Sequence, residues 1–493
     1  MPSPKDIVTS RHPSWSANSK LYEYLEQIAC AGPSWATQRN PLSIATPNKA
    51  KSLYGESTYL TQHSLESNDS FLRRANKAAV VDVTNPGLSL YVGTVGAPDS
   101  VTIDADPTWA EIFDNFDCLG NDFCSFWNSA RQSAAICGLS FVLVDSPKVD
   151  GPLNTEADAI ANGVRPYSRL IRARDVLNYR LDSNGQPLEV LFRLQAEPSG
   201  SILEATGKTC VQYRYWSKTS WIVFEQDGEE IRQIDQGDNS IGLVPIVVLY
   251  HEKGDLPWQG NSLIKSAAKF QLLLSNWLSD FGQTLENQSF SQAVLKASTT
   301  PAELGFGSSV VLTLKPDSQG ESESFSYVTP ESRALDTGWK MFTDTLRMTL
   351  RSFGITSDPL ADTGRAESGE AKMWKWKEVS KKMVSMTINE QAAVDEVLDL
   401  MAMYKGQADF TGSVTLATSF DKAILSETID ATVKLMALSL PATARKELLK
   451  SIIAQALPDL DPDTMAAIGK ELEAIPAQAA AAAPFMVPAG PAQ

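Results

Sequence analysis

A chain of 493 residues exceeds the size of one hydrophobic core and has room for roughly two to four domains. Apolar residues make up 43% and charged residues 21%, values that exclude a collagen-like, coiled-coil or wholly disordered chain. Asp and Glu number 59 against 43 Lys and Arg, a net charge of −16. This acidic excess argues against a protein that coats nucleic acid, because such binding needs many phosphate-neutralising cations, but it allows nucleic acid to slide past.

The cysteines, the apolar runs and the N-terminal residues indicate the redox state of the compartment and whether membrane or signal segments are expected. Five cysteines form no CxxC pair and are odd in number, so we expect neither a disulfide framework nor a structural zinc site and infer a reducing compartment. They are Cys30, Cys118, Cys124, Cys137 and Cys210. The longest apolar run, residues 241–250, contains Pro245 and is too short to span a membrane. The first residues include no apolar h-region, so no signal peptide is expected.

Motifs of catalysis and nucleotide binding are missing or incomplete. The three histidines form no HExxH pair, and no GxSxG nucleophile elbow occurs. Residues 364–369 have the glycine spacing of a phosphate-binding loop, but Glu370 and Ala371 stand where Lys and Ser or Thr are required. Gly305 and Gly307 lack the third glycine of a dinucleotide fingerprint. The sequence therefore predicts no enzyme, no catalytic residue, no metal site and no cofactor.

Residues 1–260 mix helical and strand patterns, which indicates an α+β region. Helices are expected at residues 20–30, 60–79 and 106–137, with Ser67 or Asn68 capping the second and Gly138 ending the third. The turn Asn85-Pro86-Gly87 divides residues 80–95 into a strand–turn–strand pattern. Further strands are expected at residues 139–145, 167–172, 188–195, 210–216 and 221–226.

Near Gly260 the pattern changes to two long helices around a β-rich insert. Residues 261–285 and 331–353 each carry one apolar stripe and would be about 37 and about 35 Å long. Strand patterns inside the insert fall at residues 292–297, 309–314 and 323–328. The helices can pack antiparallel along their stripes, with the β module at their far end. The alternative, which topology alone favours, is an ordinary helical hairpin with a decorated loop.

A polar segment and a second long helix follow. Residues 354–370 contain Pro359 and several glycines, and we expect them to form a loop of the length that is often functional. Residues 371–404 are predicted to be helical, with Trp374 and Trp376 among five lysines in the first turns. Such a pattern can contact nucleic acid, but we favour lysine stems that cover the tryptophans at a subunit contact. The lysines are Lys372, Lys375, Lys377, Lys381 and Lys382.

The C-terminal part is predicted to be mainly helical. A strand or hairpin is expected at residues 410–420, before helices at residues 428–440, 442–457 and 463–474. Residues 476–493 form an Ala/Pro-rich tail.

Several sequence segments, and the order of the predicted elements, resemble the portal proteins of tailed bacteriophages, which are head–tail connectors. The segment ICGLSFVLVDSP followed by RPYSRLIRARDVLNYRLDSNG is similar to the wing of that family. The passage LVPIVVLYHEKGDLPWQGNSLIKSAAKFQLLLSNWLSD resembles a Pro-bearing strand leading into the first stem helix. The phrases GWKMFTDTLRMTLRSFGI and SGEAKMWKWKE resemble the second stem helix and the long helix behind the tunnel loop. The resemblance covers residues 20–410, and no single invariant motif defines the family.

The resemblance implies a multi-domain α+β portal architecture with an α/β wing, a two-helix stem, a small β-rich clip, a long helix and a helical crown. In chain order its parts would be the wing at 1–260, stem helix 1 at 261–286, the clip at 287–329, stem helix 2 at 330–353, the tunnel loop at 354–370, the long wing helix at 371–404, the crown at 405–475 and the tail at 476–493.

The resemblance also implies a function. Portal subunits form a ring, commonly of twelve, at one capsid vertex, and double-stranded DNA is packaged and ejected through its channel. The implied partners are the terminase, the head–tail adaptor, the major capsid protein and scaffold proteins, with no membrane. The implied location is the virion, after assembly in the host cytoplasm.

Two sets of residues are candidates for this role. In the tunnel loop we expect four acids to repel DNA and two cations to make sparse contacts, although a solvated loop without DNA contact is the alternative. These residues are Asp358, Asp362, Glu367 and Glu370, with Arg365 and Lys372. In the stem we expect aromatic residues to pack between subunits, or else to form the hairpin's own core. They are Trp277, Phe281, Trp339 and Phe342.

Two other functions remain open from the sequence. One is a different homo-oligomeric structural protein of a virion. The other is a capsid-associated ATPase of the terminase type, against which the incomplete phosphate-binding motif at residues 364–369 argues.

Overall fold

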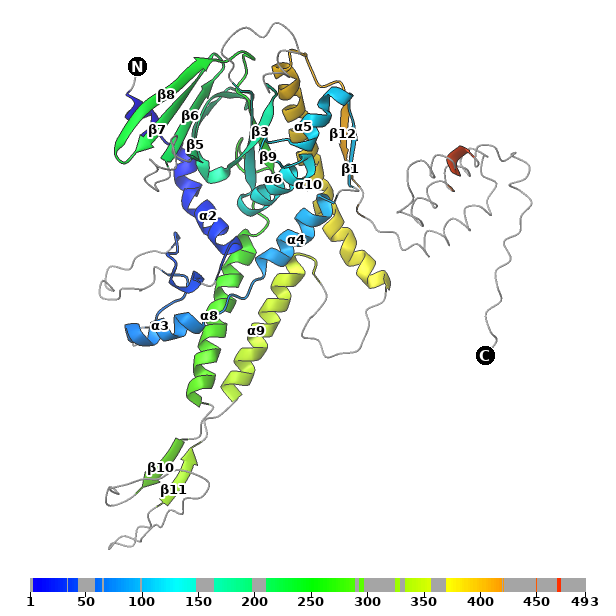
Figure 1. Ribbon diagram of the computed structural model, residues 1–493. Coiled ribbons are helices and arrows are strands. Elements are labelled where there is room, and N and C mark those ends of the chain that lie inside the picture. Colours follow the sequence, from blue (N-terminus) through cyan, green and yellow to red (C-terminus); the bar gives the residue numbers. More distant parts are fainter. Residues whose placement is uncertain are drawn as a thin grey trace, which may run out of the picture. The chain divides into compact units, whose positions relative to one another are not determined.

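The computed structural model describes residues 3–32, 34–42, 58–63, 66–97, 100–147, 164–196, 210–288, 292–296, 324–328, 333–355, 369–418, 420, 449 and 468–470. The chain divides into two compact units, Met1–Phe420 and Asp421–Gln493. In the second unit, residue 449 and residues 468–470 are described, and they are helical. The first unit mixes helices and antiparallel sheets, so the fold is α+β (Figure 1).

Long and short helices are spread along the first unit. They are α1 (Pro4–Thr9), α2 (Pro13–Ala29), α3 (Asn68–Lys77), α4 (Thr84–Val95), α5 (Ala110–Asp114), α6 (Phe123–Cys137), α8 (Lys265–Gln288), α9 (Arg333–Ser352) and α10 (Gly369–Tyr404). Single 3₁₀ turns lie at Trp35–Thr37, Pro107–Trp109 and Ala173–Asp175.

The described strands form four antiparallel sheets. The strands are β1 (Val101–Asp104), β2 (Leu139–Asp145), β3 (Tyr167–Arg172), β4 (Val176–Leu181), β5 (Pro187–Ala196), β6 (Cys210–Ser217), β7 (Ser220–Asp227), β8 (Glu230–Asp238), β9 (Ile246–Tyr250), β10 (Gln292–Lys296), β11 (Ser324–Val328) and β12 (Ser413–Leu416). Their orders are β4-β5-β6-β7-β8, β3-β2-β9, β10-β11 and β1-β12.

Strand β2 lies between two apolar cores. Its side chains alternate, because successive residues of a strand point to opposite faces. Phe141 and Leu143 join a core formed with α2, α4, the start of α8 and the five-stranded sheet. Val142 and Val144 join a second core formed with α5, α6 and the C-terminal half of α10. This two-sided burial explains why the strand is a continuous apolar run with no polar alternation.

One expected element is wrong: residues 80–95 do not form a strand–turn–strand. Thr84–Val95 is the helix α4, and Pro86 falls in its first turn, where a missing N–H costs little. Leu88, Tyr91 and Val95 are buried at helical spacing. The NPG tripeptide was therefore a helix start rather than a hairpin turn.

The expected helix at residues 106–137 is also wrong in part, because it breaks between α5 and α6. Asp117 accepts hydrogen bonds from the backbone N–H groups of Leu119 and Asn121, at 2.8 and 3.2 Å. Such side-chain bonds compete with helix formation. Gly120 adopts a φ of 98°. The predicted end at Gly138 is confirmed, with a φ of 95°.

Other boundaries differ more modestly. The expected helix at 60–79 is shorter, because α3 begins only after the cap Ser67, whose Oγ accepts from the N–H of Ser70 at 3.2 Å. Strands β1, β4 and β8 were not predicted, and β8 is mostly exposed. The predicted strand at 309–314 lies outside the described residues, as do most of the residues in the three predicted C-terminal helices.

The pairing of β12 with β1 joins two distant parts of the chain. Val101 pairs with Leu416, and Asp104 pairs with Ser413. Gln391 on α10 also donates to the carbonyl oxygen of Val414, at 2.7 Å. Residues 405–418 and Phe420 therefore belong to the first compact unit.

His251, which follows β9, gives this unit a predicted pH dependence. Burial, and to a lesser degree the charge of Lys382, lowers the pKa of His251 from 6.5 to about 4. The unfolded chain therefore binds the proton first as pH falls, so the stability present above pH 6.5 is lost on approach to pH 4. We expect a loss of about 2–3 kcal/mol in the free energy of unfolding. The free energy of unfolding of His251→Gln, measured by urea titration at several pH values, should lack this loss. An unchanged pH dependence in this variant would contradict the prediction.

Candidate functional site

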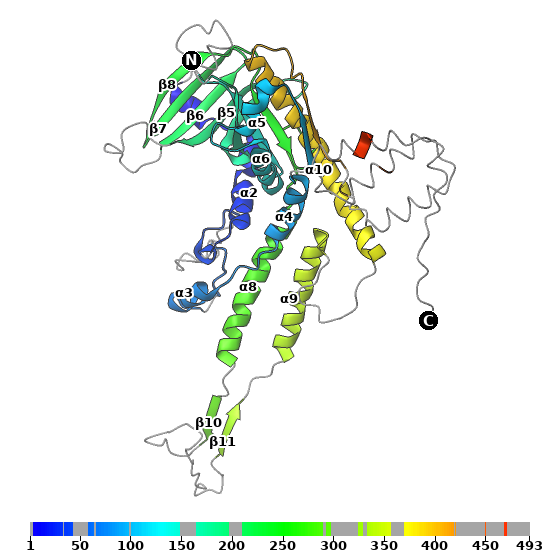
Figure 2. The same cartoon turned by 45° about the vertical axis from the view of Figure 1, so that its right-hand side comes forward.

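The helices α8 and α9 form a hairpin with its own apolar core, and they run side by side in both views (Figures 1 and 2). Leu274 and Phe342 are buried, and Trp277, Leu278, Phe281, Leu346 and Leu350 pack around them half-buried. Because the C-terminal half of α8 meets the N-terminal half of α9 through these side chains, the helices are antiparallel. The predicted pairing of the two stripes is confirmed.

The aromatic residues predicted for the stem meet at this core. The ring of Phe281 lies edge-on to Phe342 and Trp339, with centroids 6.2 and 6.1 Å apart. Trp339 stacks on Phe342 at 5.0 Å. A Cβ at Gly338 would lie 2.8 Å from the Phe281 ring, so this glycine permits the close approach. Trp277, Phe281 and Phe342 thus lie within the hairpin core, while 48% of Trp339 remains exposed.

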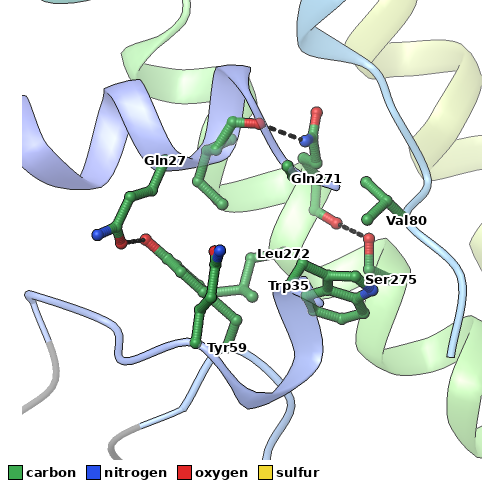
Figure 3. A pocket seen from close by; sticks show the side chains of 10 residues that line it. Gln27, Trp35, Tyr59, Val80, Gln271, Leu272 and Ser275 are labelled. Atoms are coloured by element: carbon green, nitrogen blue, oxygen red, sulfur yellow. Dashed lines mark hydrogen bonds between the residues drawn. The ribbon is translucent and has the colours of Figure 1, made fainter. Parts of the chain in front are cut away.

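A row of polar side chains fastens α8 to the segments before it. Gln271 is buried, and its Oε1 accepts from the N–H groups of Val83 and Thr84, both at 3.1 Å. Its Nε2 donates to the carbonyl oxygen of Ile28 at 3.0 Å (Figure 3). One amide side chain therefore joins α8 to α4 and α2.

The cavity beside Gln271 is too small for a ligand. Figure 3 shows Gln27, Trp35 and Tyr59 around it, and Tyr59 donates to Gln27 at 2.6 Å. Its free volume is about 10 Å³, which is room for about one water molecule. We assign it no binding role.

Further along α8, ion pairs hold α3 in place. Arg74 is buried and donates to both carboxylate oxygens of Glu66, at 2.9 and 2.7 Å. It also reaches Asp280 on α8 at 3.2 Å and the carbonyl oxygen of Thr61 at 2.6 Å. The middle of α8 is therefore fixed to the preceding segment by polar contacts, and hydrogen bonds of this kind have a defined geometry.

The candidates of the tunnel loop are only partly described. Asp358, Asp362, Arg365 and Glu367 lie outside the described residues. Glu370 and Lys372 fall in the first turn of α10, and their backbone alone is described. The structure therefore does not bring this set together as a site.

In the lysine- and tryptophan-rich start of α10, side chains are described from Trp376 onward. Lys377, Lys381 and Lys382 are exposed. Trp376 packs against the larger core, and its indole N–H donates to the carbonyl oxygen of Phe420 at 2.7 Å. This tryptophan has a structural contact within the chain, and its indole N–H is engaged there.

The hairpin itself is not acidic. Helix α8 carries two lysines and two acids, and α9 carries four cations and two acids. The negative charge of the chain must therefore lie elsewhere. Along α10 the charge is polarised, with five lysines and two acids before residue 383 and four acids without a cation after it.

Large apolar side chains are exposed on the outer faces of the hairpin. Met341 and Met348 on α9 are 55% and 58% exposed, and they lie seven residues apart on the face turned away from α8. Leu273 on α8 is 38% exposed. Both helices of the hairpin therefore expose apolar side chains away from the hairpin core.

The described part of the chain offers neither a metal cluster nor a membrane-spanning helix. No group of three or more His, Cys, Asp or Glu side chains is placed there to hold a metal ion. None of the described helices combines the length and the apolar character needed to cross a membrane.

Comparisons with known proteins found a weak structural likeness. No family model matches the sequence, and no curated protein matches it. A solved structure titled the neck of an empty GTA particle has a TM-score of 0.42 and 10% identity, covering 74% of this chain and 89% of the other. The neck of a native GTA particle and the virion of a native gene transfer agent (GTA) particle each give 0.42 and 11% identity, with the same coverage. At TM-scores below 0.5 these likenesses carry no argument about fold or function.

Proposed function

We propose that this chain is the repeating subunit of a portal ring, a head–tail connector through which double-stranded DNA enters and leaves a phage capsid. The observation that carries the proposal is the α8–α9 hairpin, which has a β-hairpin inserted between its helices and apolar side chains on its outer faces. Two of the sequence segments that resemble portal proteins fall on α8 and α9.

The exposed faces of the hairpin suit side-by-side association. Met341 and Met348 lie on α9 and Leu273 lies on α8, so each helix offers apolar surface to a neighbour. Two different faces that bind each other generate a head-to-tail interface, which closes into a ring when the rotation allows. We therefore assign α8 and α9 to the stem of a ring, commonly of twelve subunits.

The insert between the helices is assigned to the clip, residues 287–329. Strands β10 and β11 pair antiparallel, from Gln292 with Val328 to Lys296 with Ser324. A two-stranded hairpin is marginally stable alone, so it gains from strand pairing or packing with another protein. We propose the neighbouring subunit, the terminase and the head–tail adaptor as its partners.

The rest of the chain is assigned from its position relative to the stem and the clip. Residues 1–260 and the long helix 371–404 would form the wing, to which β12 also belongs through its pairing with β1. Residues 354–370 would form the tunnel loop. The crown, predicted at residues 405–475, would begin only after Phe420, because the chain up to Phe420 belongs to the first compact unit. We propose that the acids of the loop keep DNA from adhering, because phosphates are repelled by carboxylates and held by dense cations.

The proposal is tested by the assembly of the purified full-length chain. We expect a ring with an axial channel in negative-stain images, and a mass that is a whole multiple of the subunit. A monomer at high concentration would contradict the proposal. A closed ring without a channel would favour another virion structural protein, and saturable ATP binding would favour a packaging enzyme.

Charge reversal in the tunnel loop tests the DNA role. Lysine in place of Asp358, Asp362, Glu367 and Glu370 should reduce DNA packaging or retention, because the added cations hold phosphates, while the ring persists. Packaged DNA per particle and the mass of the ring are the two measurements. The matched control replaces the same four residues with Asn and Gln, which removes charge without adding cations. Normal packaging in the lysine variant would contradict the assignment.

A further inference from the structure

An open groove runs between α3 and the C-terminal half of α8, which lie next to each other in both views (Figures 1 and 2). Its free volume is about 510 Å³, so it is far larger than the cavity beside Gln271. Arg74 lines the groove, but its guanidinium is already paired with Glu66 and Asp280. The rest of the groove is surface that contacts within the chain leave unfilled.

Small side chains leave room in this groove. Ala78 and Ala79, which directly follow α3, line it together with Gly282 on α8. A Cβ added at Gly282 would meet no atom within 4 Å. Leu278 adds a half-buried apolar side chain to the lining. A surface of this kind accepts long, unbranched side chains, and methionine is the residue that adapts best to such irregular space.

Helix α9 carries an exposed stripe of matching length. Met341, Asp344 and Met348 are three and four residues apart, which places them on one face, and each side chain is more than half exposed. From Met341 to Met348 the stripe is about 10.5 Å long, and the α8 lining from Leu278 to Glu286 is about 12 Å long. The stripe is turned away from α8, so it cannot enter the groove of its own chain.

The stripe and the groove also have complementary charges. On the α3 side of the groove Arg73 is exposed, and no acid of the described residues pairs with it. On the α8 side Glu286 pairs with Lys77 at 2.7 Å, and both are exposed, so this pair contributes little and can exchange partners. A second α9 in the groove would bring Asp344 to Arg73, and it would bring the flanking cation Arg347 to Glu286.

We propose that the groove between α3 and α8 receives the Met341–Met348 stripe of α9 from a second copy of this chain. The inference rests on the proposed function in one respect, since this contact is the one that would join neighbouring subunits of the ring. Stripe and groove are different faces of one chain, so the contact is head-to-tail and can repeat around an axis. Helix α3, which lies outside the stem, thereby becomes part of the subunit interface.

Filling the groove tests this contact. Gly282→Leu places a side chain in the groove, and the matched control Gly93→Leu adds the same side chain to α4, where the added Cβ also meets no atom within 4 Å. Both replacements raise helix propensity. In sedimentation of the full-length chain, we expect Gly282→Leu to raise the concentration needed for half-assembly by roughly tenfold or more, and Gly93→Leu to leave it unchanged.

An exchange of charges covers the case in which Gly282→Leu fails to fold. Arg73→Glu and Asp344→Arg each place like charges together across the proposed contact, so each should weaken assembly. The variant that carries both changes restores an opposite-charge pair, and its half-assembly concentration should return to within roughly threefold of the parent value. If the single variants lose assembly and the combined variant does not recover it, Arg73 and Asp344 do not meet and the inference is wrong.

The outcomes separate this inference from the portal proposal. If the parent forms channelled rings and Gly282→Leu and the single charge variants form them equally well, the inference is overturned and the portal proposal stands. If assembly depends on the groove but yields no channel, the inference stands and the portal proposal is contradicted. A parent chain that stays monomeric contradicts both.

Discussion

Arg131→Met is expected to lower the free energy of unfolding by about 3–5 kcal/mol, because it leaves a buried carboxylate without its partner. Arg131 on α6 and Glu390 on α10 are 2% and 0% exposed. The Nε of Arg131 donates to Oε2 of Glu390 at 2.7 Å, and Nη2 donates to Oε1. The third guanidinium nitrogen donates to Asn128. The pair fastens α10 to α6, so its loss should loosen the long helix.

The pH dependence of this variant follows from the same pair. Burial raises the pKa of Glu390, and the guanidinium of Arg131 acts in the opposite direction. Without Arg131 the pKa of Glu390 rises further, so the folded state holds a proton that the unfolded state releases. The stability of Arg131→Met should therefore fall as pH rises above the ordinary pKa of a glutamate.

Urea unfolding of single and double variants measures the effect. The matched control, Arg131→Met with Glu390→Leu, replaces both partners by apolar side chains and should recover most of the loss. A single variant within about 1 kcal/mol of the parent at pH 8 would show that the pair does not hold the two helices together.

If the chain forms the proposed ring, Met341→Glu with Met348→Glu is expected to abolish the ring while leaving the subunit folded. Both side chains are more than half exposed in the single chain, so a charge there changes its stability by only about 0.5 kcal/mol. In a subunit interface the same two carboxylates would lose their hydration without gaining a partner, which is strongly unfavourable.

Sedimentation reports loss of the ring, and melting curves report whether the subunit remains folded. We expect the ring species to be replaced by monomer, with the melting temperature of the monomer unchanged. Leu256→Glu is the control, because Leu256 is 59% exposed but lies outside the hairpin. Rings that persist in the double variant would place the subunit contact on another surface.

Regular periodicity identified the long elements. Apolar stripes placed α8 and α9 within a few residues of their ends, and the apolar run at residues 139–145 indicated the strand β2. These predictions depend only on which side chains recur at the spacing of a helix or strand. The aromatic residues of the stem followed from the same stripes, and three of the four lie in the hairpin core.

Other predictions failed or were missed where the local sequence fits more than one structure. The NPG tripeptide at residues 85–87 is as typical of a turn as of a helix start, and burial of Leu88 and Tyr91 decided for the helix. Strand β8 carries little apolar alternation, so only its pairing with β7 makes it a strand.

The sequence by itself determined the positions and lengths of the long helices α8 and α9 and the apolar stripes along which they pack. Only the tertiary structure decided that Arg131 meets Glu390, that Phe353 covers Gly87 and that β1 pairs with β12. The members of each pair lie far apart in sequence, and no local pattern encodes which distant groups will meet. Their contacts exist because packing of the whole unit brings those faces together, and buried polar groups are stable there when they find hydrogen-bond partners.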